Sequence, residues 1–125
     1  MKKYLVLAFF AFIGNVSNAQ MTAVVVKSSD NLLLEEGYIN EKGQRDSTWI
    51  AYNDNGTISQ EGSYIRGEKD GVWNMYDDNG HKSFQVVFKN GKKRKGKQWD
   101  TQGHLIDVRK WDSEGNLICE TIRKY

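Results

Sequence analysis

Hydrophobic and polar positions alternate along short stretches of this chain, and turn residues separate the stretches. Between residues 81 and 89, Phe84, Val86 and Phe88 alternate with polar side chains. This is the period-two pattern of a strand with one buried face. Aromatic residues recur at a nearly constant interval through the chain, at Tyr52, Tyr64, Tyr76, Phe88, Trp99 and Trp111. The interval predicts a series of short strands, one after each turn.

Quartets rich in Asn, Asp and Gly lie between these predicted strands. "NDNG" ends at Gly56 and "DDNG" at Gly80, and related quartets end at Gly103 and Gly115. Such residues accept left-handed backbone angles and bond to their own backbone, which is typical of hairpin turns. With 12 Gly and no Pro, every backbone N–H remains available for strand pairing.

The pattern therefore predicts an all-β fold, an antiparallel meander of stacked β-hairpins in an elongated or curved sheet. Two strands make one repeat unit, whose length is the interval from Trp49 to Trp73. Residues 21–38 are predicted to add two more short strands around "KSSDN". The stretch "NLLLEE" within them is also compatible with a helix on propensity alone.

The first residues have the composition of a secretory signal peptide. Lys2 and Lys3 precede an apolar run from Tyr4 to Ile13, and small residues follow at cleavage spacing. The run is too short for a helix to span a bilayer of about 30 Å. We expect residues 1–19 to be a signal peptide cleaved after Ala19, and 20–125 to form a single domain that is secreted or periplasmic. The alternatives are an uncleaved anchor or a buried strand.

Charge and cysteine content narrow the classes of partner. The chain has 18 Lys+Arg against 16 Asp+Glu, and loss of Lys2 and Lys3 leaves the mature protein neutral. A general attraction to nucleic acid is therefore not expected. Cys119 is the single cysteine, so no intrachain disulfide can form. It is interpreted either as a free residue on a strand face or as half of an intermolecular disulfide.

The segment "YIRGEKDGVWNMYDDNG" (residues 64–80) resembles the bacterial variant of the MORN repeat. That unit runs aromatic, two residues, glycine, a gap, glycine, one residue, tryptophan, two residues, tyrosine, and a turn ending in glycine. It matches here at Tyr64, Gly67, Gly71, Trp73, Tyr76 and Gly80. The preceding unit matches at Tyr38, Trp49, Tyr52 and Gly56, and the following one at Phe88, Gly91, Gly96, Trp99 and Gly103.

The resemblance covers residues 38–115 and implies a sheet of stacked hairpins without catalysis. Proteins with this repeat are often labelled as the antitoxin component of a toxin–antitoxin pair. The resemblance thus implies a role in neutralising a toxin by binding. An exported member of the family could act only in the periplasm or at the cell surface.

Two groups of residues are candidates for binding a partner. The repeated aromatics Trp49, Tyr52, Trp73 and Tyr76 fall three apart within each unit, so the tryptophans and tyrosines should point to opposite faces. One series is expected in the core, and the other is available for binding. The basic run Lys92, Lys93, Arg94 and Lys95 is interpreted as a hairpin tip, either a solvated loop or a contact for an acidic partner or anionic surface.

No residue pattern predicts catalysis, a cofactor or a metal site. Asp77, Asp78 and Asn79 lie in a quartet too short for a calcium loop, and are interpreted as turn residues. His81 and His104 have no Cys or His at ligand spacing. The chain lacks a glycine-framed nucleophile and a P-loop. We therefore expect a non-enzymatic protein–protein interaction module; the alternative is a binder of envelope glycan or anionic lipid.

Overall fold

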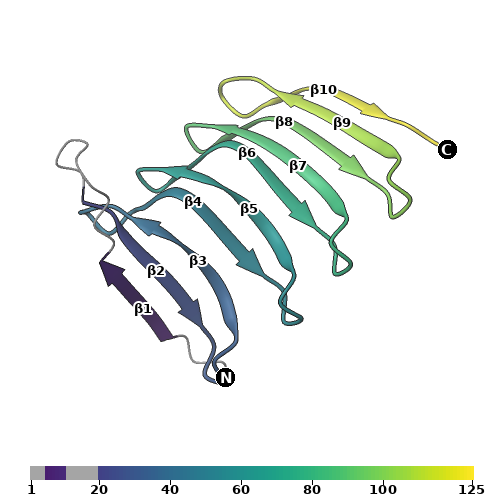
Figure 1. Ribbon diagram of the computed structural model, residues 1–125. Coiled ribbons are helices and arrows are strands. Elements are labelled where there is room, and N and C mark those ends of the chain that lie inside the picture. The colour runs from purple at the N-terminus through teal and green to yellow at the C-terminus, as the bar shows by residue number, and fades with distance from the viewer. Residues whose placement is uncertain (1–4, 11–19) are drawn as a thin grey trace.

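The chain folds into a single sheet without a second layer, in a computed structural model that describes residues 5–10 and 20–125. Its described part holds ten strands (Figure 1): β1 (Leu5–Phe10), β2 (Thr22–Lys27), β3 (Leu33–Ile39), β4 (Arg45–Tyr52), β5 (Ile58–Ile65), β6 (Glu68–Tyr76), β7 (Lys82–Lys89), β8 (Lys92–Trp99), β9 (Leu105–Trp111) and β10 (Leu117–Ile122). The predicted signal peptide, residues 1–19, lies outside the described residues except for β1.

The strands are hydrogen-bonded in the order of the sequence, from β1 to β10, and each neighbouring pair is antiparallel. Figure 1 shows the two ends of the meander far apart, so the sheet is open and elongated. The predicted all-β meander is confirmed. The segment 33–39 is strand β3, so the helical alternative for "NLLLEE" is wrong; pairing with β2 and β4 outweighs the local helix propensity.

Asx turns close the hairpins at one side of the sheet, as the quartets predict. In the first quartet the Asn53 N–H donates to Thr57 O (2.8 Å) and the Gly56 N–H donates to Asn53 O (2.9 Å). The same two bonds recur at Asp77, where Gly80 has a φ of 84°. Because glycine adopts this left-handed angle without strain, one Gly ends each quartet.

The two faces of the sheet differ in composition. Trp73 pairs with Val86 across β6 and β7, whereas the adjacent Asn74 pairs with Gln85, so Trp73 and Asn74 point to opposite faces. We call the first the tryptophan face. It holds the small core, made of Val24, Trp49, Trp73 and Phe88. We call the other the tyrosine face, because Tyr52 and Tyr76 bond there to the carboxylates of Glu36 and Glu61.

Glycines on the odd strands make room for the tryptophans. A Cβ added at Gly62 would lie 2.2 Å from Cδ2 of Trp73, and one at Gly37 would lie 2.3 Å from Cδ2 of Trp49. Each indole therefore lies directly over the backbone of the preceding strand. Its Nε1–H donates to a carbonyl of that strand, at 2.8 Å for Trp49 to Tyr38 O and 3.0 Å for Trp73 to Ser63 O.

Candidate binding surfaces

The tryptophans belong to a continuous edge-to-face series of rings. Ring centroids lie 6.3 Å apart for Trp49 and Tyr64, 5.0 Å for Tyr64 and Trp73, and 6.5 Å for Trp73 and Phe88, with near-perpendicular planes. Trp49 is 4% exposed and Trp73 is 2% exposed. This burial favours the core interpretation of the two tryptophans, because neither offers a ring face to a ligand.

A cation lies over each of three tryptophan rings, those of Trp49, Trp73 and Trp111. The Arg45 guanidinium is 4.0 Å from the Trp49 ring centroid, Lys69 Nζ is 4.5 Å from that of Trp73, and Lys93 Nζ is 5.8 Å from that of Trp111. These distances are within the range of cation–π attraction. The three cations are evenly spaced in the sequence, at the same interval as the first two tryptophans. They cover the solvent side of the tryptophan face.

The cations differ in how they are compensated. Arg45 makes two hydrogen bonds to the Glu35 carboxylate, at 3.0 and 2.8 Å. The pKa of Lys69 is lowered, first by burial and then by the positive charges of Lys93 and Arg45. The tryptophan face is therefore a packed surface with a positive cover.

The candidate tyrosines have a different environment. Tyr52 Oη donates to Glu36 Oε1 (2.6 Å), and Tyr76 Oη donates to Glu61 Oε1 (2.7 Å). These hydrogen bonds, followed by burial, raise the pKa of each tyrosine to about 12. Both side chains are half-buried, so the tyrosine face offers part of each ring together with a fixed carboxylate. Sequence analysis missed Glu36 and Glu61, whose only signal is their cross-strand position.

Residues 89–97 contain the β7–β8 turn, as the hairpin-tip interpretation expects, but Lys92 to Lys95 lie on strand β8, so the solvated-loop alternative is wrong. Asn90 and Gly91, with φ of 51° and 77°, form a two-residue turn of the type I′ class. Strand β8 then begins at Lys92. Such a tight turn leaves no loop, and the lysines and Arg94 enter the ladder.

The four basic candidates do not share one surface. Lys93 reaches over Trp111 on the tryptophan face. Arg94 is the extra residue of a β-bulge, between the pairs Val87–Lys95 and Phe88–Lys93. Lys92 and Lys95 are exposed. The four basic side chains therefore have three different environments: Lys93 lies over the Trp111 ring, Arg94 lies in a bulge, and Lys92 and Lys95 are in solvent.

Strand register brings like charges face to face at this end of the sheet. Lys89 is directly opposite Lys92 across the turn, and Lys95 is directly opposite Lys110 of β9. All four side chains are exposed. Residues 82–99 contain seven Lys or Arg and no Asp or Glu. We call the exposed set Lys89, Lys92, Lys95, Lys97 and Lys110 the lysine cluster; Lys110 joins it only through strand pairing.

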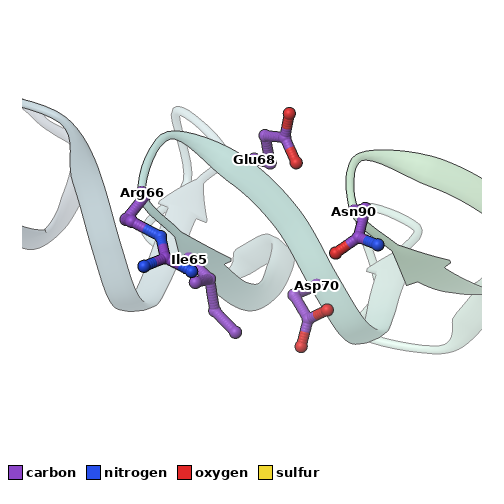
Figure 2. A pocket seen from close by; sticks show the side chains of 5 residues that line it. All are labelled: Ile65, Arg66, Glu68, Asp70 and Asn90. Carbon is purple, nitrogen blue, oxygen red and sulfur yellow. The ribbon is translucent and has the colours of Figure 1, made fainter.

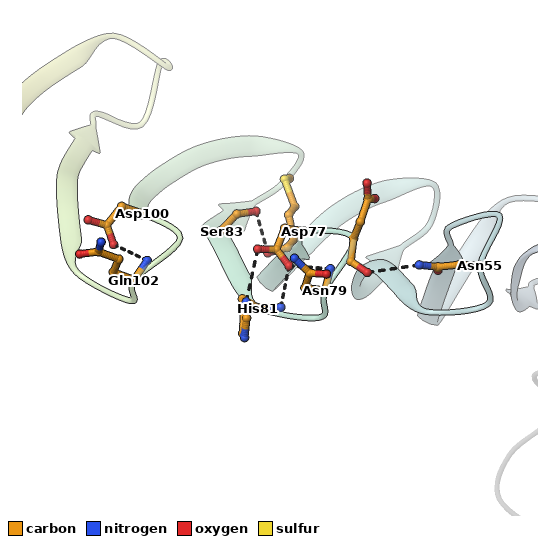
Figure 3. A network of polar contacts seen from close by, with 9 residues as sticks. Asn55, Asp77, Asn79, His81, Ser83, Asp100 and Gln102 are labelled. Carbon is orange, nitrogen blue, oxygen red and sulfur yellow. Dashed lines mark hydrogen bonds and ion pairs between the residues drawn. The ribbon is translucent and has the colours of Figure 1, made fainter.

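The carboxylates of the turn residues Asp77 and Asp100 accept hydrogen bonds from backbone N–H groups of their own turns (Figure 3). Asp77 Oδ1 accepts from the N–H groups of Asn79 and His81, both at 2.9 Å. These bonds, that from His81 first, lower the pKa of Asp77. Asp100 accepts in the same way from Gln102 and His104, at 2.9 and 2.8 Å. Within residues 5–10 and 20–125, no three His, Cys, Asp or Glu side chains are placed to hold a metal ion.

A shallow hollow lies beside the tight turns, lined by Ile65, Arg66, Glu68, Asp70 and Asn90 (Figure 2). Its volume is about 230 Å³, below the roughly 300–1,000 Å³ of small-molecule pockets. The two carboxylates point away from each other in Figure 2. The hollow does not gather polar groups around one ligand atom.

Comparison of the chain with known protein families, with curated proteins and with solved structures finds no match. The resemblance to the MORN-repeat variant therefore stays a prediction that rests on its residues. In the described part of the chain, no helix has the length and hydrophobicity needed to cross a membrane.

Proposed function

We propose that the protein is an exported, non-enzymatic binding module that recognises an acidic protein partner through the lysine cluster. The repeated hairpins supply a rigid scaffold, and β7 to β9 supply the contact. If the resemblance to the MORN-repeat variant extends to function, the partner would be a toxin that is neutralised by binding outside the cytoplasm.

The observation that carries the proposal is the pairing of Lys95 with Lys110. Like charges directly opposite each other destabilise a sheet. Between residues 82 and 99, no acidic residue offsets the charge. Carboxylates from a partner would remove this repulsion, so part of the binding free energy is already provided by the strained charge distribution of the free protein.

Electrostatic recognition of this kind acts mainly on the association rate and on the choice of partner. The mature protein is expected to be neutral as a whole, so its remainder is net acidic and the pull is local to one end of the sheet. An acidic strand or loop lying across β8 and β9 would meet Lys95, Lys97 and Lys110 together. These side chains come from adjacent strands, within about 5–8 Å of one another.

The test compares two variants of equal net charge in capture from an envelope extract. One carries Lys95→Gln and Lys110→Gln. The matched control carries Lys42→Gln and Arg66→Gln, which are exposed cations in turns outside β7, β8 and β9. We expect the first variant to lose a salt-eluted partner that the wild type and the control retain. Equal capture by both variants contradicts the proposal.

Binding to an envelope glycan or anionic lipid is the second candidate, because the same acid-free strands β7 and β8 would also meet a polyanionic surface. Sedimentation with anionic and neutral vesicles, and with purified envelope polysaccharide, separates the two. A protein that sediments with these and captures no protein would replace our first proposal by the second.

A further inference from the structure

Strand β10 is the least covered element of the sheet. All six of its residues are exposed, whereas every other strand with described side chains has at least four half-buried or buried residues. Leu117, Ile118 and Ile122 are 49%, 65% and 66% exposed. Among the described residues, β10 pairs only with β9. An exposed apolar edge of this kind is a template for pairing with another strand.

The backbone of β10 is oriented for such pairing. The Arg123 N–H donates to Ile106 O at 2.8 Å, in register with the pairs Thr121–Val108 and Cys119–Lys110. Because N–H directions alternate along a strand, the N–H and C=O groups of Glu120 and Ile122 point to the open side.

We propose that two copies of the protein associate by antiparallel pairing of their β10 strands, around a two-fold axis at Glu120. This register uses the outward N–H and C=O groups of Glu120 and Ile122. It sets Ile118, the extra residue of the bulge between Leu117 and Cys119, opposite Ile122 of the second copy, and the reverse. Two apolar cross-strand pairs therefore form on the same face, and the two sheets become one continuous sheet.

Charge complementarity favours a second copy as the occupant. Glu120 meets its counterpart at the axis, but Arg109 Nη2 lies 2.8 Å from Glu120 Oε1 within each copy, so each carboxylate keeps its own cation. In the antiparallel arrangement, Arg123 and Lys124 run beside the β9–β10 turn of the other copy. That turn carries Asp112 and Glu114.

The two-fold arrangement also closes on itself. An isologous contact uses the same strand in both copies and stops at a dimer, whereas pairing of β10 with a different strand would continue into open chains. The expected product is therefore one species of twice the protomer mass. Cys119 is opposite Thr121 of the second copy in this register, at about 4.5 Å between Cα atoms. The two Cys119 residues are offset by two positions and are not paired.

The first test is the mass of the protein purified under reducing conditions, measured by light scattering over a dilution series. We expect a dimer that dissociates on dilution, and a dissociation constant raised at least about tenfold in Ile118→Lys, since each 1.4 kcal/mol is tenfold. Val72→Lys is the matched control, because Val72 is 49% exposed and lies on β6. A wild-type monomer at every concentration, an open series of masses, or a dimer unaffected by Ile118→Lys overturns the proposal.

Two further variants test the register. Glu114→Lys should weaken the dimer, and adding Lys124→Glu to the same chain should restore it, which loss of folding cannot do. Thr121→Cys should give a covalent dimer on mild oxidation, while wild-type Cys119 alone does not. Failure of both the rescue and the cross-link contradicts the two-fold register. None of these variants alters the lysines that we assign to the acidic partner, so the two proposals fail separately.

Discussion

Hairpins β5–β6 and β7–β8 occupy equivalent places in the repeat but differ in burial and in charge. In β5–β6, Trp73 is 2% exposed, and Arg66 and Lys69 are balanced by three acids. In β7–β8, the tryptophan face carries the buried Gly96 instead of a tryptophan, Lys95 and Lys97 beside it are exposed on the other face, and no acid is present. Both hairpins have the same kind of two-residue turn, at Arg66–Gly67 and at Asn90–Gly91, although their bulges differ. The second hairpin therefore keeps the turn but lacks the buried tryptophan and carries an excess of positive charge.

The difference between the two hairpins coincides with a change in which strands carry the packed tryptophans. Trp49 and Trp73 lie on even-numbered strands, each over a glycine of the preceding strand. After β8 the pattern moves to Trp111 on β9, whose ring atoms approach a Cβ position at Gly96 to 3.0 Å. The core series of rings ends at Phe88, and Lys97, adjacent to Gly96, lies on the opposite face of β8. The comparison teaches that the position of a tryptophan in the repeat decides which face of a hairpin is free for binding.

The largest expected effect separates the two hairpins by stability. Trp73→Ala removes a buried indole that contacts Tyr64 and Phe88, and should lower the free energy of unfolding by about 3–5 kcal/mol. Trp111→Ala, on the half-buried end of the sheet, should cost less. Urea unfolding followed by circular dichroism measures both. Equal losses would mean that the core extends evenly through the C-terminal strands.

The glycines give the next effect. Gly62→Ala places a methyl group against the Trp73 ring, where the nearest atom would be 2.2 Å away, and overpacking of this kind costs about 1–3 kcal/mol. Gly96→Ala meets only the outer edge of Trp111 at 3.0 Å, so a small shift of that ring relieves it. We expect a clear loss of thermal stability for the first and a slight one for the second. The reverse order would contradict the packing described for the tryptophan face.

A pH effect should belong to the aromatic half of the sheet. The pKa of Tyr52 and of Tyr76 is raised to about 12 in the folded protein, against about 10 when unfolded. Their contribution is complete below pH 10 and is lost as pH rises toward 12, because the unfolded chain releases the protons first. Tyr76→Phe should cost about 0.5–1.5 kcal/mol at neutral pH and flatten this alkaline decline. Absorbance titration at 295 nm measures the pKa values of the tyrosines. If both tyrosines titrate with a midpoint near 10, they do not cause the alkaline loss of stability.

The smallest expected effect is a gain in stability, and it comes from a substitution in the lysine cluster. Lys110→Glu replaces a repulsive pair with Lys95 by an attractive one, which should stabilise the protein by about 0.2–1 kcal/mol. Lys42→Glu, in a turn on the other half of the chain, is the control for net charge. Thermal unfolding at low and at high salt gives the comparison, and the gain should shrink with salt. If the two variants are equally stable, the repulsion that we assign to Lys95 and Lys110 does not destabilise the protein.

Much of the backbone was predictable because its determinants are local. The quartets ending at Gly56 and Gly80 fix turns through residues that need left-handed angles, and the alternation of Phe84, Val86 and Phe88 identifies a strand. The sequence could also place tryptophans and tyrosines on opposite faces, since that depends only on their spacing within one strand.

The binding surface was less predictable because it depends on pairing between strands. β-bulges shift the register by one residue, as at Arg94 between Val87 and Phe88, and no local signal gives their positions. The pairing of Lys95 with Lys110 belongs to the β8–β9 ladder, which has its own shift between Gln98 and Trp99. The two-residue turn at Asn90 and Gly91 is present in the sequence, and it leaves no room for a solvated loop before strand β8.

The sequential strand order also determines how the protein comes apart. Every substantial contact joins strands that are adjacent in the sequence, so each hairpin is stabilised only by its neighbours, as in a one-dimensional array. Opening can then proceed one strand at a time rather than all at once. In dilute, monomeric protein, amide hydrogen exchange should be fastest in β10 and slow progressively toward β6, where the Trp73 ring holds two neighbouring hairpins together.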